Sequence, residues 1–110
     1  AIINVSTHGS LRPHPSFIPY AAAKAGLNAM TEGLALAFGP TVRVNTLMPG
    51  PFLTDVSAAW DFDGNANPFG NSALQRAGRP AEIVGAALFL MSDASSFTTG
   101  SILRADGGSV

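Results

Sequence analysis

The sequence predicts an α/β fold in which helices flank a parallel sheet. Three apolar runs with β-branched residues, at 1–5, 41–47 and 101–105, have the composition of buried strands. Two segments, at 20–38 and from Arg79 onwards, carry helical signals and separate those runs. Strands that alternate with helices are typical of parallel sheets with right-handed crossovers. In such sheets, ligands bind in the loops that follow the carboxyl ends of the strands.

The first predicted helix, 20–38, contains no proline and carries two stripes at helical spacing. One stripe is large and apolar and comprises Leu27, Met30, Leu34 and Phe38. The other is small throughout and comprises Ala22, Gly26, Ala29 and Gly33. Each glycine costs a helix about 1 kcal/mol relative to alanine, so two of them on one stripe indicate a packing role. The small stripe predicts a close helix contact, either with a partner chain at a dimer interface or within this chain.

Proline and glycine delimit the remaining elements. A loop is expected over 6–19, a helix end at Gly39-Pro40, and a sharp turn at Pro49-Gly50-Pro51. Pro80 suits the first position of the second helix, and Glu82 suits its positive end. We expect the buried face of that helix to contain Ile83, Val84, Ala87, Leu88 and Met91.

Composition and charge exclude several classes of protein. The chain has 110 residues, enough for one small domain, and its net charge of -1 leaves no basic footprint for nucleic acid and no polybasic membrane patch. No apolar run is long enough to span a bilayer. Cysteine is absent, which excludes a disulfide scaffold and fits a reducing, cytoplasmic compartment. His8 and His14 have no ligand-like spacing, so no metal is expected.

Tyr20 and Lys24 form the pair with the clearest chemical meaning. They stand four residues apart at the start of the first helix, which puts both side chains on one face. An ammonium near a phenol favours the phenolate and lowers the tyrosine pKa, so the pair predicts a general acid or base that works near neutral pH. Ser6 and Thr7 add hydroxyls at the carboxyl end of the strand just upstream. Alone, a Tyr/Lys pair is weak evidence, and an ordinary surface contact is its commoner meaning.

The surrounding segments make the pair more specific. In chain order they are Asn4-Val5-Ser6-Thr7, Tyr20-Ala21-Ala22-Ala23-Lys24, Arg43-Val44-Asn45, Pro49-Gly50 with Thr54, Gly78-Arg79-Pro80, and Thr99-Gly100 before Asp106-Gly107-Gly108. Together, and in this order, they resemble the short-chain dehydrogenase/reductase family over essentially the whole chain. The resemblance implies a Rossmann-like parallel sheet with flanking helices, of which this chain would hold the three C-terminal strands of the doubly wound fold. It also implies NAD or NADP as cofactor, a small carbonyl or alcohol substrate, and a homodimer or homotetramer.

The resemblance implies a role for each residue of the pair. Tyr20 would give a proton to the substrate oxygen or take one from it and would also contact the cofactor. Lys24 would bind the nicotinamide ribose and lower the tyrosine pKa. A hydroxyl at the strand end would bind the substrate oxygen. The spacing to Tyr20 favours Thr7 for this hydroxyl, whereas the glycine three residues later, Gly9, favours Ser6. Both residues remain candidates.

The same resemblance assigns residues to the cofactor and the substrate. Pro49, Gly50, Phe52 and Thr54 would hold the nicotinamide carboxamide. The segment 55–78 corresponds to the variable substrate-binding part of the family. Its aromatic residues, among them Trp60, either line an apolar pocket or pack locally. His14 is expected to approach the substrate.

The glycine-rich loop that binds the dinucleotide phosphates in such domains is absent from the sequence. We therefore expect residues 1–110 to be the C-terminal part of a single NAD(P)-binding domain whose N-terminal half is absent. This absence leaves a second interpretation open, in which the chain is an inactive fragment or a non-catalytic scaffold that serves association.

Overall fold

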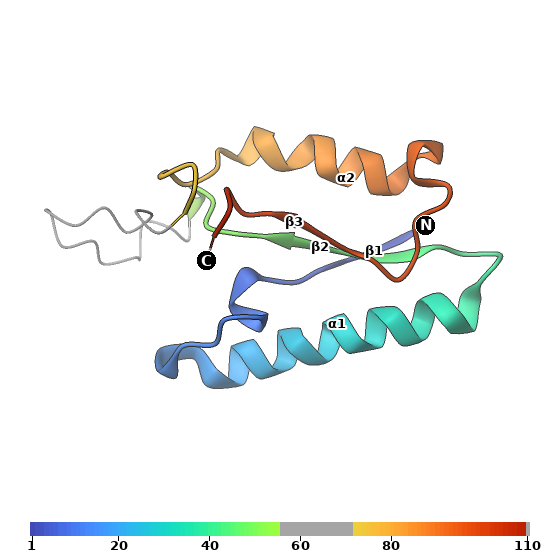
Figure 1. Ribbon diagram of the computed structural model, residues 1–110, viewed down its shortest axis with the longest axis horizontal. Coiled ribbons are helices and arrows are strands. Elements are labelled where there is room, and N and C mark those ends of the chain that lie inside the picture. The colour runs from blue at the N-terminus through green and yellow to red at the C-terminus, as the bar shows by residue number, and fades with distance from the viewer. Residues whose placement is uncertain (56–71, 110) are drawn as a thin grey trace, which may run out of the picture.

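The computed structural model describes residues 1–55 and 72–109 and confirms the parallel α/β architecture (Figure 1). Three strands, β1 (Ile2–Val5), β2 (Val44–Pro49) and β3 (Ile102–Ala105), pair in the order β1-β2-β3. Both pairings are parallel, so all three carboxyl ends meet at one edge. The candidate residues of the sequence therefore converge on that edge.

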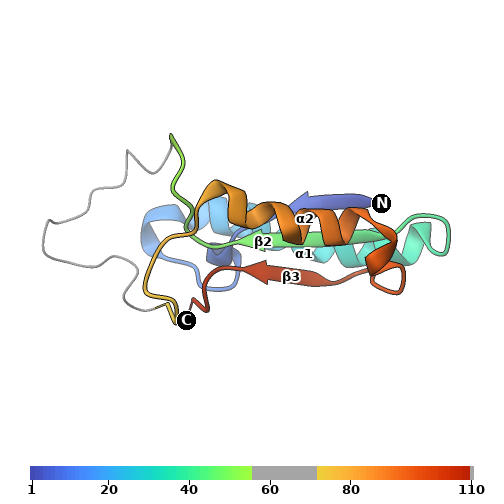
Figure 2. The ribbon, with the colours of Figure 1, turned by 90° about the horizontal axis from the view of Figure 1, so that it is seen from above.

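Two helices cover the sheet, one on each face. α1 (Ile18–Phe38) lies on one side and α2 (Val84–Met91) on the other, as both views show (Figures 1 and 2). The two crossovers step across the sheet in the same direction, from β1 to β2 and from β2 to β3. Because their helices lie on opposite faces, the crossovers have opposite hands, and the expectation that both are right-handed is wrong. A parallel sheet has two apolar faces to bury, and this arrangement covers both.

Short 3-10 turns precede both helices, so neither helix begins at the residue that the sequence predicted. The segment expected to be a plain loop forms 3-10 turns at His8–Ser10 and Pro15–Phe17, and α1 begins two residues earlier than predicted. The second helix begins as a 3-10 turn, Pro80–Ile83, before it continues as α2. These turns satisfy backbone groups at the helix entrances and bring the chain back onto the sheet.

The face of α1 that packs on the sheet is small and polar rather than large. Its buried residues are Ala21, Asn28, Thr31 and Ala35. Asn4 of β1 donates a hydrogen bond from Nδ2 to Oγ1 of Thr31 over 3.0 Å, which ties the helix to the strand. Met30 and Phe38, from the large apolar stripe, are about half exposed. Small side chains let the helix approach the sheet closely, so the large ones lie beside the contact.

The small stripe of α1 has no contact within the described chain. A Cβ atom built on Gly26 or Gly33 would meet no atom within 4 Å among the residues that the structure describes. Ala22 and Ala29 are exposed as well. Within the described residues nothing packs on this stripe, so the structure leaves open whether another part of the protein or a partner chain contacts it.

The buried side of α2 is rotated from the predicted one. Leu90 is buried, and Ile83 and Ala87 are partly buried, whereas Val84, Leu88 and Met91 of the expected face are exposed. Every residue from 84 to 91 is apolar or glycine, so the sequence contains no polar face that would fix the rotation. No helix among the described residues has the length and apolar character needed to cross a membrane.

β2 is the central strand and forms the core. Val44, Thr46 and Met48 have no exposed surface. Asn45 donates from Nδ2 to the carbonyl of Thr98 over 2.9 Å and accepts from the amide of Ser101 over 3.0 Å. These bonds set the register of β3 against β2 and so fix where the carboxyl ends of the strands stand.

Candidate active site

A cavity of about 980 Å³ opens at the carboxyl ends of β1 and β2 and collects most of the predicted site residues. The predicted residues along its wall are Ser6, Thr7, Tyr20, Lys24, Pro49, Gly50, Phe52 and Thr54. The lining residues that sequence reasoning did not assign are Val5, His8, Gly9, Arg12, Phe17, Leu47, Pro51, Pro80, Ile83 and Ala87. The volume is at the upper end of the range of about 300–1,000 Å³ for ligand pockets, so the cavity is large enough for a small-molecule ligand.

Tyr20 and Lys24 meet at the start of α1. The Nζ atom of Lys24 lies 6.0 Å from the centroid of the Tyr20 ring. The same nitrogen donates a hydrogen bond to the carbonyl oxygen of Val5 over 2.8 Å. Tyr20 is about half exposed and borders the cavity. The last carbonyl of β1 thus holds the ammonium beside the phenol.

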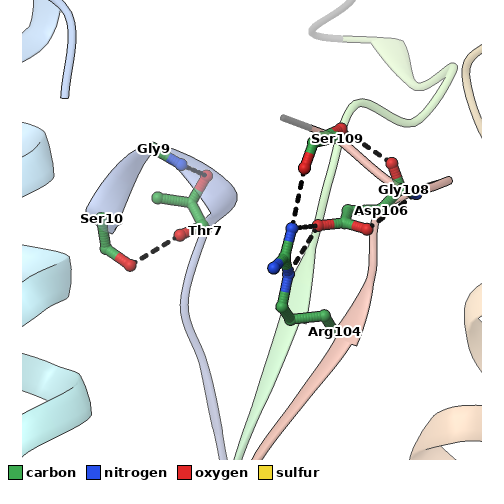
Figure 3. Close-up of polar contacts among 7 residues, drawn as sticks. All are labelled: Thr7, Gly9, Ser10, Arg104, Asp106, Gly108 and Ser109. Atoms are coloured by element: carbon green, nitrogen blue, oxygen red, sulfur yellow. Dashed lines mark hydrogen bonds and ion pairs between the residues drawn. The ribbon is translucent and has the colours of Figure 1, made fainter. Parts of the chain in front are cut away.

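Ser6 and Thr7 both border the cavity, but their surroundings differ. Ser6 is 3% exposed, and its hydroxyl lies 3.4 Å from the Lys24 carbonyl and from the Ser10 hydroxyl. Thr7 is only partly buried and caps the His8–Ser10 turn by accepting a hydrogen bond from the Gly9 amide (Figure 3). Among the described residues, the Thr7 hydroxyl donates to no protein group. Ser6 is therefore built into the scaffold, whereas Thr7 keeps a free donor.

Ser10 is the residue that organises this turn. Its hydroxyl donates to the carbonyl oxygen of Thr7 over 2.7 Å (Figure 3). The same hydroxyl accepts from Nδ2 of Asn28 over 2.9 Å. Asn28 is buried on α1, so the contact joins the turn after β1 to the helix that carries Tyr20. The position of Thr7 relative to Tyr20 depends on this bridge.

Segment 49–54 forms the opposite wall and is tightly packed against the end of β3. The amide of Gly50 donates to the carbonyl of Ala105 over 3.0 Å. A Cβ atom on Gly50 would lie 2.7 Å from both Cα and Cβ of Asp106, so only glycine fits here. The glycine of the Pro-Gly turn is required by this close approach of two backbones.

Asp106 is fixed by Arg104 and by the turn that follows (Figure 3). It accepts from Nε and Nη2 of Arg104 over 2.9 and 2.7 Å and from the Gly108 amide over 3.0 Å. Burial acts to raise the pKa of Asp106, but these hydrogen bonds and the charge of Arg104 outweigh it, so the pKa is lowered. This ion pair was not predicted from the sequence.

Of the remaining predicted substrate residues, the structure describes His14 but not Trp60. His14 does not border the cavity; its ring stacks on Phe17 at 5.6 Å between centroids, and its Nδ1 accepts from the Ser16 amide. Its substrate role stays a prediction. Trp60 lies outside the described residues. Within those residues, no cluster of His, Asp and Glu suits a metal ion.

The chain is similar in sequence to known proteins. Residues 1–109 match the family described as Enoyl-(Acyl carrier protein) reductase. The chain is 41% identical over 109 residues to the 3-oxoacyl-[acyl-carrier-protein] reductase FabG of Chlamydia trachomatis, covering 98% of this chain and 44% of the relative.

Solved structures of other proteins have a similar fold. The crystal structure of a short-chain dehydrogenase/reductase, glucose/ribitol dehydrogenase, from Brucella melitensis superposes with a TM-score of 0.89 at 29% identity, covering 97% of this chain and 44% of that one. A gluconate 5-dehydrogenase from Burkholderia cenocepacia, in complex with NADP and tartrate, gives a TM-score of 0.90 at 34% identity, covering 97% and 43%. The chain thus spans less than half the length of these relatives. With the family match over 1–109 and the fold in common, the chain belongs to the short-chain dehydrogenase/reductase family.

Proposed function

We propose that the protein containing this chain is an NAD(P)-dependent oxidoreductase that acts on a small carbonyl compound or secondary alcohol, with Tyr20 as its general acid and base. The observation that carries the proposal is a single cavity lined by Tyr20, Lys24, the hydroxyl residues at the end of β1, and segment 49–54. Ligands bind at this edge of parallel sheets. A non-catalytic protein that serves only association would not need these side chains around one cavity.

The cofactor is NAD or NADP, which supplies or accepts the hydride when bound. Segment 49–54 is suited to the nicotinamide carboxamide, with the backbone near Phe52 and the hydroxyl of Thr54 as its contacts. Lys24 is suited to the nicotinamide ribose. An ammonium has three N–H donors, and the Val5 carbonyl uses one, which leaves two for ribose hydroxyls. The site for the dinucleotide phosphates is then formed outside residues 1–110.

In the direction of reduction, the residues of this chain bind and protonate the substrate oxygen. Hydride reaches the carbonyl carbon while the Tyr20 hydroxyl gives its proton to the oxygen, and the resulting phenolate takes a proton from water. Lys24 stabilises the negative charge on the phenol because its ammonium is held on the same side of α1. In oxidation the same steps run in reverse.

Thr7 is our choice for the hydroxyl that binds the substrate oxygen, and Ser6 for a structural role. The nearly buried Ser6 hydroxyl is surrounded by protein acceptors, whereas Thr7 borders the cavity with a donor to spare. This choice follows the spacing to Tyr20 rather than the position of Gly9.

The test is Tyr20→Phe in the natural protein that contains this chain. Loss of the proton donor is expected to lower turnover by about 100- to 10,000-fold, while binding of NADH or NADPH, followed by nucleotide fluorescence, stays unchanged. Near-normal turnover in this variant would contradict the proposal. Loss of nucleotide binding together with turnover would mean that Tyr20 is needed for the fold and would contradict its role as acid and base.

Self-association is part of the proposal. We infer a homodimer or homotetramer that buries the small stripe of α1, since those glycines meet nothing among the described residues of one chain. We also place the protein in the cytoplasm and expect neither nucleic acid nor a membrane among its partners, on the basis of charge and composition. The scaffold interpretation rests on the same stripe, and only the Tyr20 experiment separates it from the enzyme.

A further inference from the structure

The wall of the cavity at Phe52 is shaped by a second segment that lies behind it. The amide of Leu53 donates to the carbonyl of Gly78 over 2.9 Å, and the amide of Gly78 donates to the carbonyl of Pro51 over 2.9 Å. Phe52 and Gly78 therefore pair as an isolated parallel bridge outside the sheet. The backbone on both sides of Phe52 takes its position from segment 77–79.

The Phe52 ring lies directly on Gly78. A Cβ atom at Gly78 would be 2.6 Å from Cε1 and 2.8 Å from Cδ1 of the ring, well inside van der Waals contact. A side chain at this position requires either that the Phe52 ring shifts or that the backbone bridge between Phe52 and Gly78 opens. Phe52 also borders the catalytic cavity, so the displacement reaches the wall of the site.

An ion pair holds segment 77–79 in place. Arg76 donates from both Nη atoms to the two carboxylate oxygens of Glu82, over 2.8 and 2.7 Å. Glu82 also accepts from the Arg79 amide over 2.7 Å, which caps the turn that leads into α2. Such a bidentate pair restricts both partners in direction as well as distance. The residues between them are thereby anchored to the start of α2.

We propose that Gly78 and the Arg76–Glu82 pair are positioning residues that set the Phe52 backbone for the nicotinamide carboxamide. The inference rests on the proposed function, because it assigns a purpose to the contact only if segment 49–54 holds the nicotinamide. It requires the effect of a substitution at Gly78 to be confined to the nicotinamide end of the cofactor. In the proposed function the dinucleotide phosphates would be held outside residues 1–110 and thus away from this wall.

Two ligands distinguish this role from a general structural one. NADH or NADPH, whichever the natural protein binds, carries the nicotinamide, whereas ADP-ribose or its 2′-phosphate lacks it. We expect Gly78→Ala to weaken binding of the reduced nucleotide by about tenfold in calorimetry, with the ADP-ribose dissociation constant unchanged. Turnover should fall on the order of 100-fold, since a misplacement of about 1 Å has effects of that size. The matched control is Gly85→Ala on α2, where a Cβ atom meets no atom of the described residues within 4 Å. It should leave both ligands and turnover unchanged.

Glu82→Gln is the second variant and carries the test if Gly78→Ala does not fold. It keeps the shape of the side chain and removes the charge. We expect it to weaken binding of the reduced nucleotide, but not of ADP-ribose, by a smaller factor than Gly78→Ala does. Arg76→Lys should retain more nucleotide affinity than Arg76→Gln. Equal weakening of both ligands in Gly78→Ala and Glu82→Gln, or no weakening of either, overturns the inference and leaves the proposed function intact. A natural protein that binds neither ligand overturns the proposed function itself.

Discussion

Ser6 and Thr7 are adjacent residues that differ in what surrounds them. The contacts that separate them reach Ser10 and the Lys24 carbonyl, four and eighteen residues along the chain. Sequence spacing identified the Tyr20/Lys24 pair because both members belong to one helical turn. Spacing did not decide whether Ser6 or Thr7 binds the substrate oxygen, because both lie where a strand ends and a turn begins. Only the contacts with α1 distinguish the two residues.

Substitution of each hydroxyl should separate activity from stability. Thr7→Val keeps the shape and removes the donor, so kcat/KM is expected to fall on the order of 100-fold, as for loss of an oxyanion donor. Ser6→Ala removes hydrogen bonds that are nearly buried and should cost about 1 kcal/mol in the free energy of unfolding, with little change in kcat/KM. Steady-state kinetics and urea denaturation measure the two effects. The reverse pattern, with Ser6→Ala inactive and Thr7→Val near normal, would assign the role to Ser6.

At the scale of elements, the sequence predicted which segments form helices better than it predicted how they are rotated. The start of α1 was missed by two residues because the preceding 3-10 turns carry no strong pattern of their own. The buried side of α2 was missed because eight apolar or glycine residues in a row satisfy any rotation. Contacts with the sheet decide the rotation, and those are long-range.

The ion pair at the turn between segment 77–79 and α2 should make the stability of the protein depend on pH, with a loss of stability in acid. Hydrogen bonds from Arg76 and from the Arg79 amide hold the pKa of Glu82 well below its usual range. A lowered folded-state pKa contributes stability that is complete above the unfolded value of about 4.3 and is lost as the pH falls below it. The urea midpoint of the wild type should therefore decline more steeply between about pH 5 and pH 1 than that of Glu82→Gln. Parallel pH profiles for the two proteins would mean that the pair adds nothing to stability.

At the scale of the whole molecule, the alternation of strands and helices predicted a parallel sheet, and the structure confirms it. The hand of the crossovers was not predictable in the same way. A right-handed connection is the general rule, but a sheet with both faces apolar needs a helix on each, and two helices in successive crossovers across three strands then require opposite hands.

Self-association through the small stripe of α1 is also a property of the whole molecule. Gly33→Leu places a large side chain on the small stripe of α1 and should lower the mass found by analytical ultracentrifugation towards that of a single chain of the natural protein. Ala94→Leu, an equally exposed site in the turn after α2, serves as the matched control and should leave the mass unchanged. An unchanged mass for Gly33→Leu would remove the stripe from the interface.

The contact between Gly50 and Asp106 gives the cavity wall a mechanical property. Because the two backbones are in contact without any intervening side chain, the turn after β2 cannot move closer to the end of β3. The Arg104 pair in turn ties Asp106 to the last residues of the described chain. The turn after β2 and the final turn are thereby joined through Asp106, so we expect a displacement of the final turn to reach the wall of the cavity.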